Sequence, residues 1–155
     1  MKNFTSKMDK RTGLMTTSFV VFAVAVPFVM YKLGAPRVSL FMVSLIMALA
    51  FITSYMMIPQ LFLNDKTIVI KNNFVNIKIP FDDINTIEEN PKIGLNIRTM
   101  GVGGLFGHFG YFNGNDVWYV TNIYNKVKIT MKSGKVYMIS PENPEEFIKK
   151  VKNFS

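Results

Sequence analysis

The sequence predicts a membrane helical hairpin followed by a small α+β domain. Two uncharged runs, residues 12–31 and 38–64, are each long enough to cross a hydrocarbon core of about 30 Å, which takes roughly 20 helical residues. Only six residues separate the runs, so the two helices must be antiparallel neighbours. After them, segments of alternating apolar and polar residues lead to an amphipathic C-terminal segment, as in a sheet followed by a helix.

The N-terminal part, residues 1–63, contains both predicted membrane helices. The second helix, residues 38–60, is the more apolar, and its ten Leu, Ile, Val and Phe side chains favour insertion by about 3 to 6 kcal/mol. The first, residues 13–31, has nine such side chains and several hydroxyl residues, so its insertion depends on the second. Gly34 suits the end of the first helix, and Pro36 suits the start of the second.

Two other interpretations of this part remain open. A basic start, an apolar stretch and Ala23-Val24-Ala25 are typical of a cleavable signal peptide, although the apolar run is long for one. The second is a soluble hairpin buried in a protein core. Neither run has a polar face, and the rest of the chain is too short to cover both, so the membrane hairpin is favoured.

Basic residues flank the hairpin mainly on the side of the chain ends. Residues 1–63 carry six basic and one acidic side chain, and four of the basic ones precede the first helix. By the positive-inside rule, we expect a multi-pass protein of the inner (plasma) membrane with both termini in the cytoplasm. Topology accounts for most of the net charge of +8, so nucleic acid is not an expected partner.

The C-terminal part, residues 64–155, is expected to contain strands and one helix. The helix starts near Pro144, and either Ser140 or Asn143 caps it. Its apolar stripe, expected to pack on the sheet, consists of Phe147, Ile148, Val151 and Phe154. Strands are predicted at residues 67–71, 74–79, 84–88, 117–121, 126–132 and 135–139, the last two joined by a Ser133-Gly134 turn.

Two stretches give the C-terminal part a family resemblance. The first is the glycine- and aromatic-rich run 98–112, and the second is the ending 126–151, where a hairpin is followed by Ser140-Pro141 and the helix. Together with the preceding hairpin, they resemble the membrane-anchored members of the bacterial pleckstrin-homology (PH)-like domain family. The resemblance implies an α+β PH-like domain, in which a bent antiparallel sheet or partial barrel is closed by a C-terminal helix. It implies no common reaction.

The residue types present argue against catalysis. The chain has one histidine, His108, and no cysteine, so it cannot form a multi-histidine metal site or a Cys–His nucleophile. The acidic pairs 82–83 and 88–89 are neighbours in sequence, and neighbouring side chains on a strand point apart. The glycine run lacks the Gly-Lys-Ser/Thr ending of a phosphate-binding loop. We therefore expect a non-enzymatic protein without catalytic residues, metal or cofactor.

Two groups of side chains are candidate interaction surfaces. The aromatic group, in the glycine-rich run, either fills the domain core or contacts the bilayer interface or a partner. The lysine group, in the C-terminal hairpin, is predicted by strand alternation to share one face, either solvated or turned toward anionic lipid. The aromatic group is Phe106, Phe109, Tyr111 and Phe112, and the lysine group is Lys126, Lys128, Lys132 and Lys135.

The favoured functional prediction is an integral membrane protein whose cytoplasmic PH-like domain acts as a protein-interaction or scaffolding module. Its expected partners are the lipid bilayer and proteins, including a second copy of the chain. Two alternatives remain: an anionic-lipid-binding or sensory module, and an accessory subunit of a membrane complex.

Overall fold

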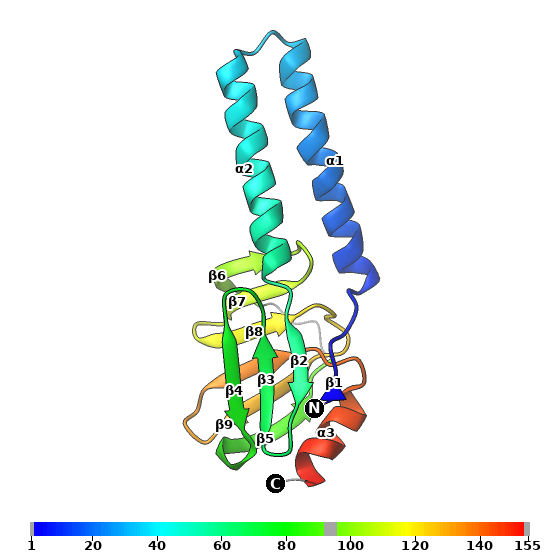
Figure 1. The fold of residues 1–155 in the computed structure, drawn as a ribbon, viewed down its shortest axis with the longest axis vertical. Coiled ribbons are helices and arrows are strands. Elements are labelled where there is room, and N and C mark those ends of the chain that lie inside the picture. The colour runs from blue at the N-terminus through cyan, green and yellow to red at the C-terminus, as the bar shows by residue number, and fades with distance from the viewer. Residues whose placement is uncertain (1, 92–95, 154–155) are drawn as a thin grey trace.

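The computed structural model describes residues 2–91 and 96–153, which form a helical hairpin standing on a β-rich domain (Figure 1). Helix α1 spans Lys10–Lys32 and helix α2 spans Arg37–Met56. Gly34, with φ of 74°, ends α1 as predicted, and its N–H donates to the Tyr31 carbonyl at 3.1 Å. The predicted antiparallel hairpin is therefore confirmed as a structural unit.

Helix α2 ends before the predicted position. The apolar run predicted a helix to residue 60, whereas Met56 is the last helical residue and strand β2 starts at Gln60. Pro59 explains the difference, because proline lacks an N–H and disfavours the helical conformation in the residue before it. The second apolar run is thus divided between a helix and the first long strand of the domain.

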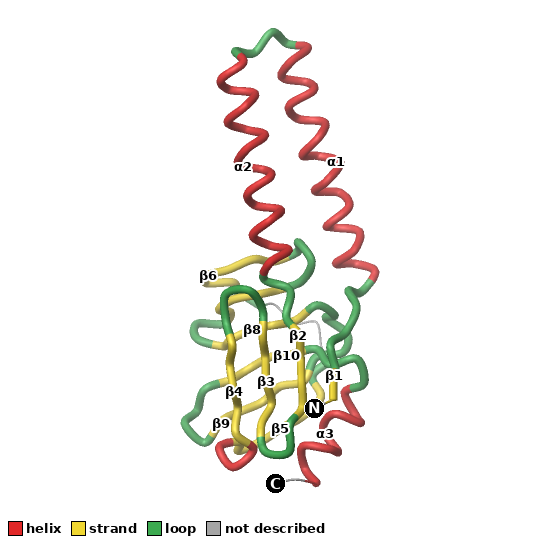
Figure 2. Tube along the Cα trace, in the orientation of Figure 1, coloured by secondary structure: helices red, strands yellow, loops and turns green. Residues whose placement is uncertain are grey.

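Two sheets form the domain, and neither closes into a barrel (Figure 2). Their strand orders are β1-β2-β3-β4 and β5-β9-β10-β8-β7-β6, and among the described strands only β8 and β10 pair in parallel. A short 3₁₀ turn, Phe81–Asp83, connects the two sheets. The strands are β1 Lys2–Asn3, β2 Gln60–Leu63, β3 Thr67–Lys71, β4 Asn76–Pro80, β5 Ile84–Glu89, β6 Arg98–Gly103, β7 His108–Phe112, β8 Asp116–Val120, β9 Val127–Met131 and β10 Val136–Ile139.

The main core lies between the sheets and is covered at one end by helix α3, Pro144–Asn153. The predicted apolar stripe packs on this core, since Phe147 and Val151 are buried and Ile148 is half-buried against them. Phe154, the last member of the predicted stripe, lies outside the described residues. The α+β PH-like architecture predicted from the sequence is therefore confirmed.

Residues 2–9 pack into the domain, although the sequence pattern groups them with the hairpin. Strand β1 pairs with β2, and Phe4 packs edge-on against Phe147 with ring centroids 5.2 Å apart. Because α1 follows these residues and β2 follows α2, both open ends of the hairpin are attached to one domain on one side (Figure 1).

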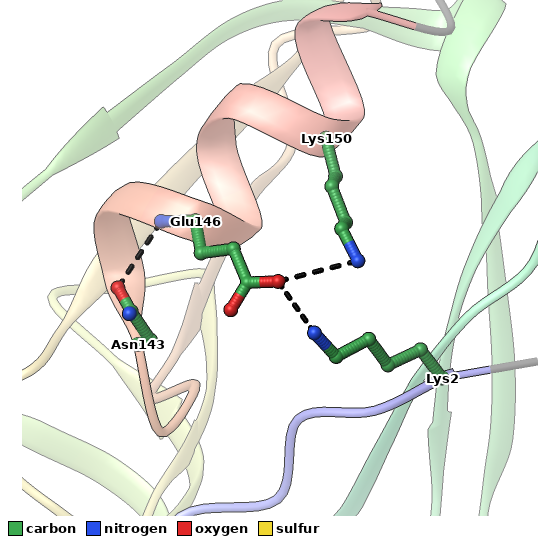
Figure 3. Close-up of polar contacts among 4 residues, drawn as sticks. All are labelled: Lys2, Asn143, Glu146 and Lys150. Carbon is green, nitrogen blue, oxygen red and sulfur yellow. Dashed lines mark hydrogen bonds and ion pairs between the residues drawn. The ribbon is translucent and has the colours of Figure 1, made fainter.

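A polar cluster ties β1 to the first turn of α3 (Figure 3). The Glu146 carboxylate contacts Lys2 Nζ and pairs with Lys150 Nζ at 3.2 Å. Hydrogen bonds from Lys2 and then Lys150 hold the pKa of Glu146 below its usual value. Asn143 caps the same turn, since its Oδ1 accepts the Glu146 N–H at 3.1 Å. One of the two predicted caps, Asn143, therefore forms.

Candidate functional site

The best-defined cluster of aromatic and polar contacts joins the hairpin to the domain, and we call it the junction. Its centre is the β6–β7 loop, residues 104–107, which rises between the lower ends of α1 and α2 (Figures 1 and 2). Phe106 at the tip is 8% exposed. Its ring packs edge-on against Phe51 and Tyr55 of α2, with centroids 5.0 and 5.5 Å away.

Helix α1 holds the other side of the same loop through Thr16. The Thr16 hydroxyl accepts the Phe106 N–H at 2.9 Å and donates to the Thr12 carbonyl at 2.9 Å. The Gly104 carbonyl lies 3.4 Å from the same hydroxyl. Thr12 and Thr16 are the buried residues of α1, one helical turn apart on the face turned toward the domain.

Glycines allow this close approach of the loop. Gly104 has φ of 102°, and a Cβ there would lie 2.7 Å from the terminal methyl of Met15. A Cβ at Gly107 would lie 2.4 Å from the Val120 carbonyl oxygen, which cannot move without displacing strand β8. Phe106 itself has φ of 59°, which is uncommon outside glycine. The glycine-rich run is therefore required to fit a loop between two helices and a strand.

Asp9 connects the start of α1 to the loop after β8. Its carboxylate accepts the N–H and hydroxyl of Thr12 at 2.8 and 2.9 Å and the N–H of Ile123 at 3.0 Å. Burial alone raises the pKa of Asp9, but these hydrogen bonds outweigh it, so the pKa lies below its usual value. A single ionised side chain thus caps α1 and attaches it to the domain.

A hydroxyl cluster continues this attachment into the sheet. The Ser6 and Thr121 hydroxyls lie 2.9 Å apart, and those of Thr121 and Ser140 lie 3.1 Å apart. Ser140 Oγ also accepts the Thr121 N–H at 2.9 Å. All three side chains are buried, so each hydrogen bond is formed away from water. Ser140, the alternative predicted helix cap, has this role instead.

The lower end of α2 is held by the turn between β3 and β4. Asn72 Nδ2 donates to the Met57 carbonyl at 2.9 Å, and the Asn73 N–H donates to the Met56 carbonyl at 3.3 Å. These bonds satisfy carbonyls that a helix leaves unpaired at its C-terminus. The domain therefore contacts both helices at their ends as well as through the β6–β7 loop.

His108, the first residue of β7, directly follows the loop at the centre of the junction. Burial, followed by the charges of Lys126, Arg11 and Arg98, lowers the pKa of His108, against an opposing effect of Asp9. Among the described residues, no group of three or more His, Cys, Asp or Glu side chains is placed to hold a metal ion.

The predicted aromatic group is divided between different surroundings. Phe109 is fully buried, and Phe112 stacks on Trp118 with centroids 4.6 Å apart, so both fill the domain's own interior. Tyr111 is 42% exposed. Phe106 packs on α2, an arrangement that neither sequence interpretation included. The four residues do not form one surface.

The predicted shared face of the four lysines is wrong. The sequence suggested a two-residue turn at Ser133-Gly134, but the Met131 N–H donates to the Lys135 carbonyl, which makes a three-residue loop. This one-residue change in register exchanges the two faces of β10 relative to β9. As a result, Met138 pairs with Lys128 and lies on the same face of the sheet. Lys135 lies on the opposite face, with its Nζ 5.2 Å from the Tyr137 ring.

Lys126, in contrast to the exposed Lys135, is buried. Its side chain is 2% exposed, and Nζ lies 5.5 Å from the centre of the Trp118 ring. Burial lowers the pKa of Lys126. Lys128 is half-buried beside Glu88, at 4.0 Å, and Lys132 is exposed at the loop. The hairpin therefore has no continuous basic face.

Sequence reasoning missed Asp9, Thr12 and Thr16, which position the junction. One signal was present: Thr12 and Thr16 are polar residues four apart at the start of an apolar helix, and they share one helix face. Which loop they meet depends on contacts far apart in sequence, such as the Thr16–Phe106 bond.

Comparison with known proteins assigns the domain to a family. The family model described as "Bacterial PH domain" matches residues 59–154. No curated protein and no solved structure matches the chain. PH-like domains are generally non-enzymatic modules. The match covers more than half of the chain, so this protein belongs to the bacterial PH domain family, with two apolar helices preceding the domain.

Proposed function

We propose that the protein spans the inner membrane twice and holds its PH-like domain at the cytoplasmic surface as a non-enzymatic protein-interaction or scaffolding module. The observation that carries the proposal is the junction, where Thr16 of α1 and Phe51 of α2 both contact one loop of the domain. A domain attached to both helices has one orientation relative to the bilayer. That is the property a platform for other proteins requires.

The surface of the hairpin supports its placement in lipid. Both helices are long and apolar enough to cross a membrane, and only 6% of each apolar window is buried in the protein. A hairpin in a soluble core would be mostly covered. Large exposed apolar patches of this kind require lipid or another protein around them.

The attachment of residues 2–9 supports the proposed topology. These residues and the rest of the domain lie at the same end of the hairpin, so they are on the same side of the membrane. The basic residues before α1 favour the cytoplasmic side. Cleavage after Ala25 would remove β1 and the buried Phe4, which weakens the signal-peptide interpretation.

An open groove of about 620 Å³ between β1 and the start of α3 is the surface best placed for a protein partner. It lies away from the hairpin (Figure 1), and its lining includes apolar, amide and acidic side chains. These residues include Phe4, Tyr124, Asn125, Glu142 and Glu145.

Two experiments test the proposal. The chain contains no cysteine, so Ala35→Cys and Lys132→Cys each introduce a single site for a membrane-impermeant maleimide in intact cells. We expect labelling at Ala35→Cys, and at Lys132→Cys only after permeabilisation. Labelling of Lys132→Cys in intact cells would contradict the topology.

A photo-crosslinking residue at Tyr124 tests the interaction role. If correctly inserted protein forms no crosslink to another protein, the proposed interaction role is refuted.

A sensory role is the second candidate, because Phe106 separates the helices at the domain end. A change in helix spacing would move Phe106 and, through Gly107, strand β7. The lipid-headgroup role receives less support, since the lysines predicted for it do not share a face. Spin labels on α1 and β7 would test the sensory role. That role requires the distance between the two labels to change when a stimulus acts on the hairpin.

A further inference from the structure

We propose that the domain itself enters the bilayer: the tip of the β6–β7 loop, Leu105-Phe106, lies within the hydrocarbon region between the two helices, and Phe74 lies at its cytoplasmic boundary. This inference rests on the proposed membrane insertion of the hairpin. It adds that the PH-like domain contacts lipid directly, through segments other than the lysine hairpin.

Helix length sets the level of the membrane boundary. Lys32 and Arg37 flank the connecting turn and mark the far surface of the bilayer. From there, α1 reaches back to Thr12 and α2 reaches to Met56, each about 30 Å long at 1.5 Å per residue. A hydrocarbon core of about 30 Å therefore uses the full apolar length of both helices. Its near boundary falls close to Thr12 and Met56.

The loop contacts both helices above that boundary. Thr16, which binds the Phe106 N–H at 2.9 Å, is four residues inside Thr12, or about 6 Å along the axis. Phe51, whose ring centroid is 5.0 Å from that of Phe106, is five residues inside Met56, or about 7 Å. The loop tip is therefore placed several ångströms inside the hydrocarbon region.

The hydrogen bonds of the loop suit a position without water. Non-helical backbone at membrane depth must have its polar groups paired within the protein. The Gly104 N–H donates to the Gly107 carbonyl at 2.9 Å, and the Phe106 N–H donates to the Thr16 hydroxyl. The same hydroxyl lies 3.4 Å from the Gly104 carbonyl. Leu105, half-buried beside these groups, adds an apolar side chain at the same level.

Phe74 is fixed at the level of the α2 terminus. Asn72 Oδ1 accepts the Phe74 N–H at 2.8 Å, while Asn72 Nδ2 donates to the Met57 carbonyl at 2.9 Å. The turn that carries Phe74 is thus tied to the last residues of α2. Phe74 is 57% exposed, although it is a large apolar residue. Aromatic side chains with this placement are enriched where the hydrocarbon meets the headgroups.

Spin labels on single cysteines in the full-length protein, reconstituted in phospholipid vesicles, test the proposal. Oxygen concentrates in lipid and a neutral nickel chelate in water, so the ratio of their accessibilities reports immersion. The test sites are Leu105→Cys and Phe74→Cys. Phe22→Cys, 57% exposed on α1, is the lipid control, and Tyr124→Cys, 51% exposed on the domain, is the water control.

We expect the oxygen-to-nickel ratio at positions 105 and 74 to be several-fold above that at 124 and closer to that at 22. Water-like ratios at 105 and 74 with a lipid-like ratio at 22 overturn this inference and leave membrane insertion intact. A water-like ratio at 22 overturns the proposed insertion and this inference with it. If Leu105→Cys unfolds the domain, labelling of the unchanged loop by a photoreactive group on a lipid tail replaces it, and the label at position 74 still tests the placement of Phe74.

Discussion

Replacing Thr16 by valine tests how the domain is held on the hairpin. Valine keeps the shape of threonine but removes the hydroxyl that accepts the Phe106 N–H at 2.9 Å. Thr16 is 7% exposed and Phe106 is 8% exposed, so water cannot readily replace the lost acceptor. A buried N–H without a partner costs about 1 to 3 kcal/mol. The Thr12 carbonyl also loses its bond from Thr16, at a lower cost because a carbonyl has two acceptor positions.

Hydrogen exchange of the β6–β7 loop in lipid nanodiscs measures this effect. We expect the Phe106 amide to exchange about 5- to 150-fold faster in Thr16→Val than in the unchanged protein, as a loss of about 1 to 3 kcal/mol implies. Thr17→Val is the matched control, since Thr17 is the next residue of α1 and is exposed. Equal exchange of this amide in the two variants would refute the role assigned to Thr16.

Three further predictions concern the domain and its attachment. Gly107→Ala should lower the unfolding temperature more than Gly13→Ala, because a Cβ at Gly107 would lie 2.4 Å from a carbonyl of β8, whereas nothing lies within 4 Å of a Cβ at Gly13; equal losses would contradict the packing. The pKa of Asp9 is lowered in the folded state, so its stabilisation is complete above the pKa of the unfolded carboxyl and is lost as pH falls through the folded pKa. The free energy of unfolding of Asp9→Asn should therefore fall less steeply with decreasing pH in the acidic range than that of the unchanged protein. An unchanged slope would count against the Asp9 contacts. Phe147→Ala should cost about 3 to 5 kcal/mol in denaturant unfolding, against less than about 0.5 kcal/mol for the exposed Lys149→Ala, and similar midpoints would place Phe147 outside the core.

Elements with a strong local pattern could be predicted from the sequence. The two apolar helices, the helix at Phe147 and the strands at residues 67–71 and 84–88 each carry their own periodicity or β-branched run, so distant contacts were not needed. The family resemblance on the glycine-rich run then supplied the PH-like fold. The error at the end of α2 was avoidable, because Pro59 is visible in the sequence.

The junction and the lysine hairpin could not be predicted in the same way. Strand β1 has two residues, too few for any alternation, and its position depends on pairing with residues about sixty positions later. The bond between Thr16 and Phe106 links residues ninety positions apart. In the hairpin, one extra loop residue was enough to move Met138 to the side of Lys128, because strand faces alternate with a period of two.

The attachments of the hairpin determine which surfaces of the domain remain available. The β6–β7 loop, the β3–β4 turn and residues 2–9 are all used to hold the helices or the sheet edge. If the hairpin spans the membrane, the β6–β7 loop and the β3–β4 turn face the bilayer, and the groove that β1 forms with the start of α3 lies away from it (Figure 1). A flexible tether would let a bound partner take any orientation. In the proposed role, a domain fixed by both helices would instead present that groove at a constant distance and angle from the membrane, so a partner bound there would be aligned with the membrane as well as recruited to it.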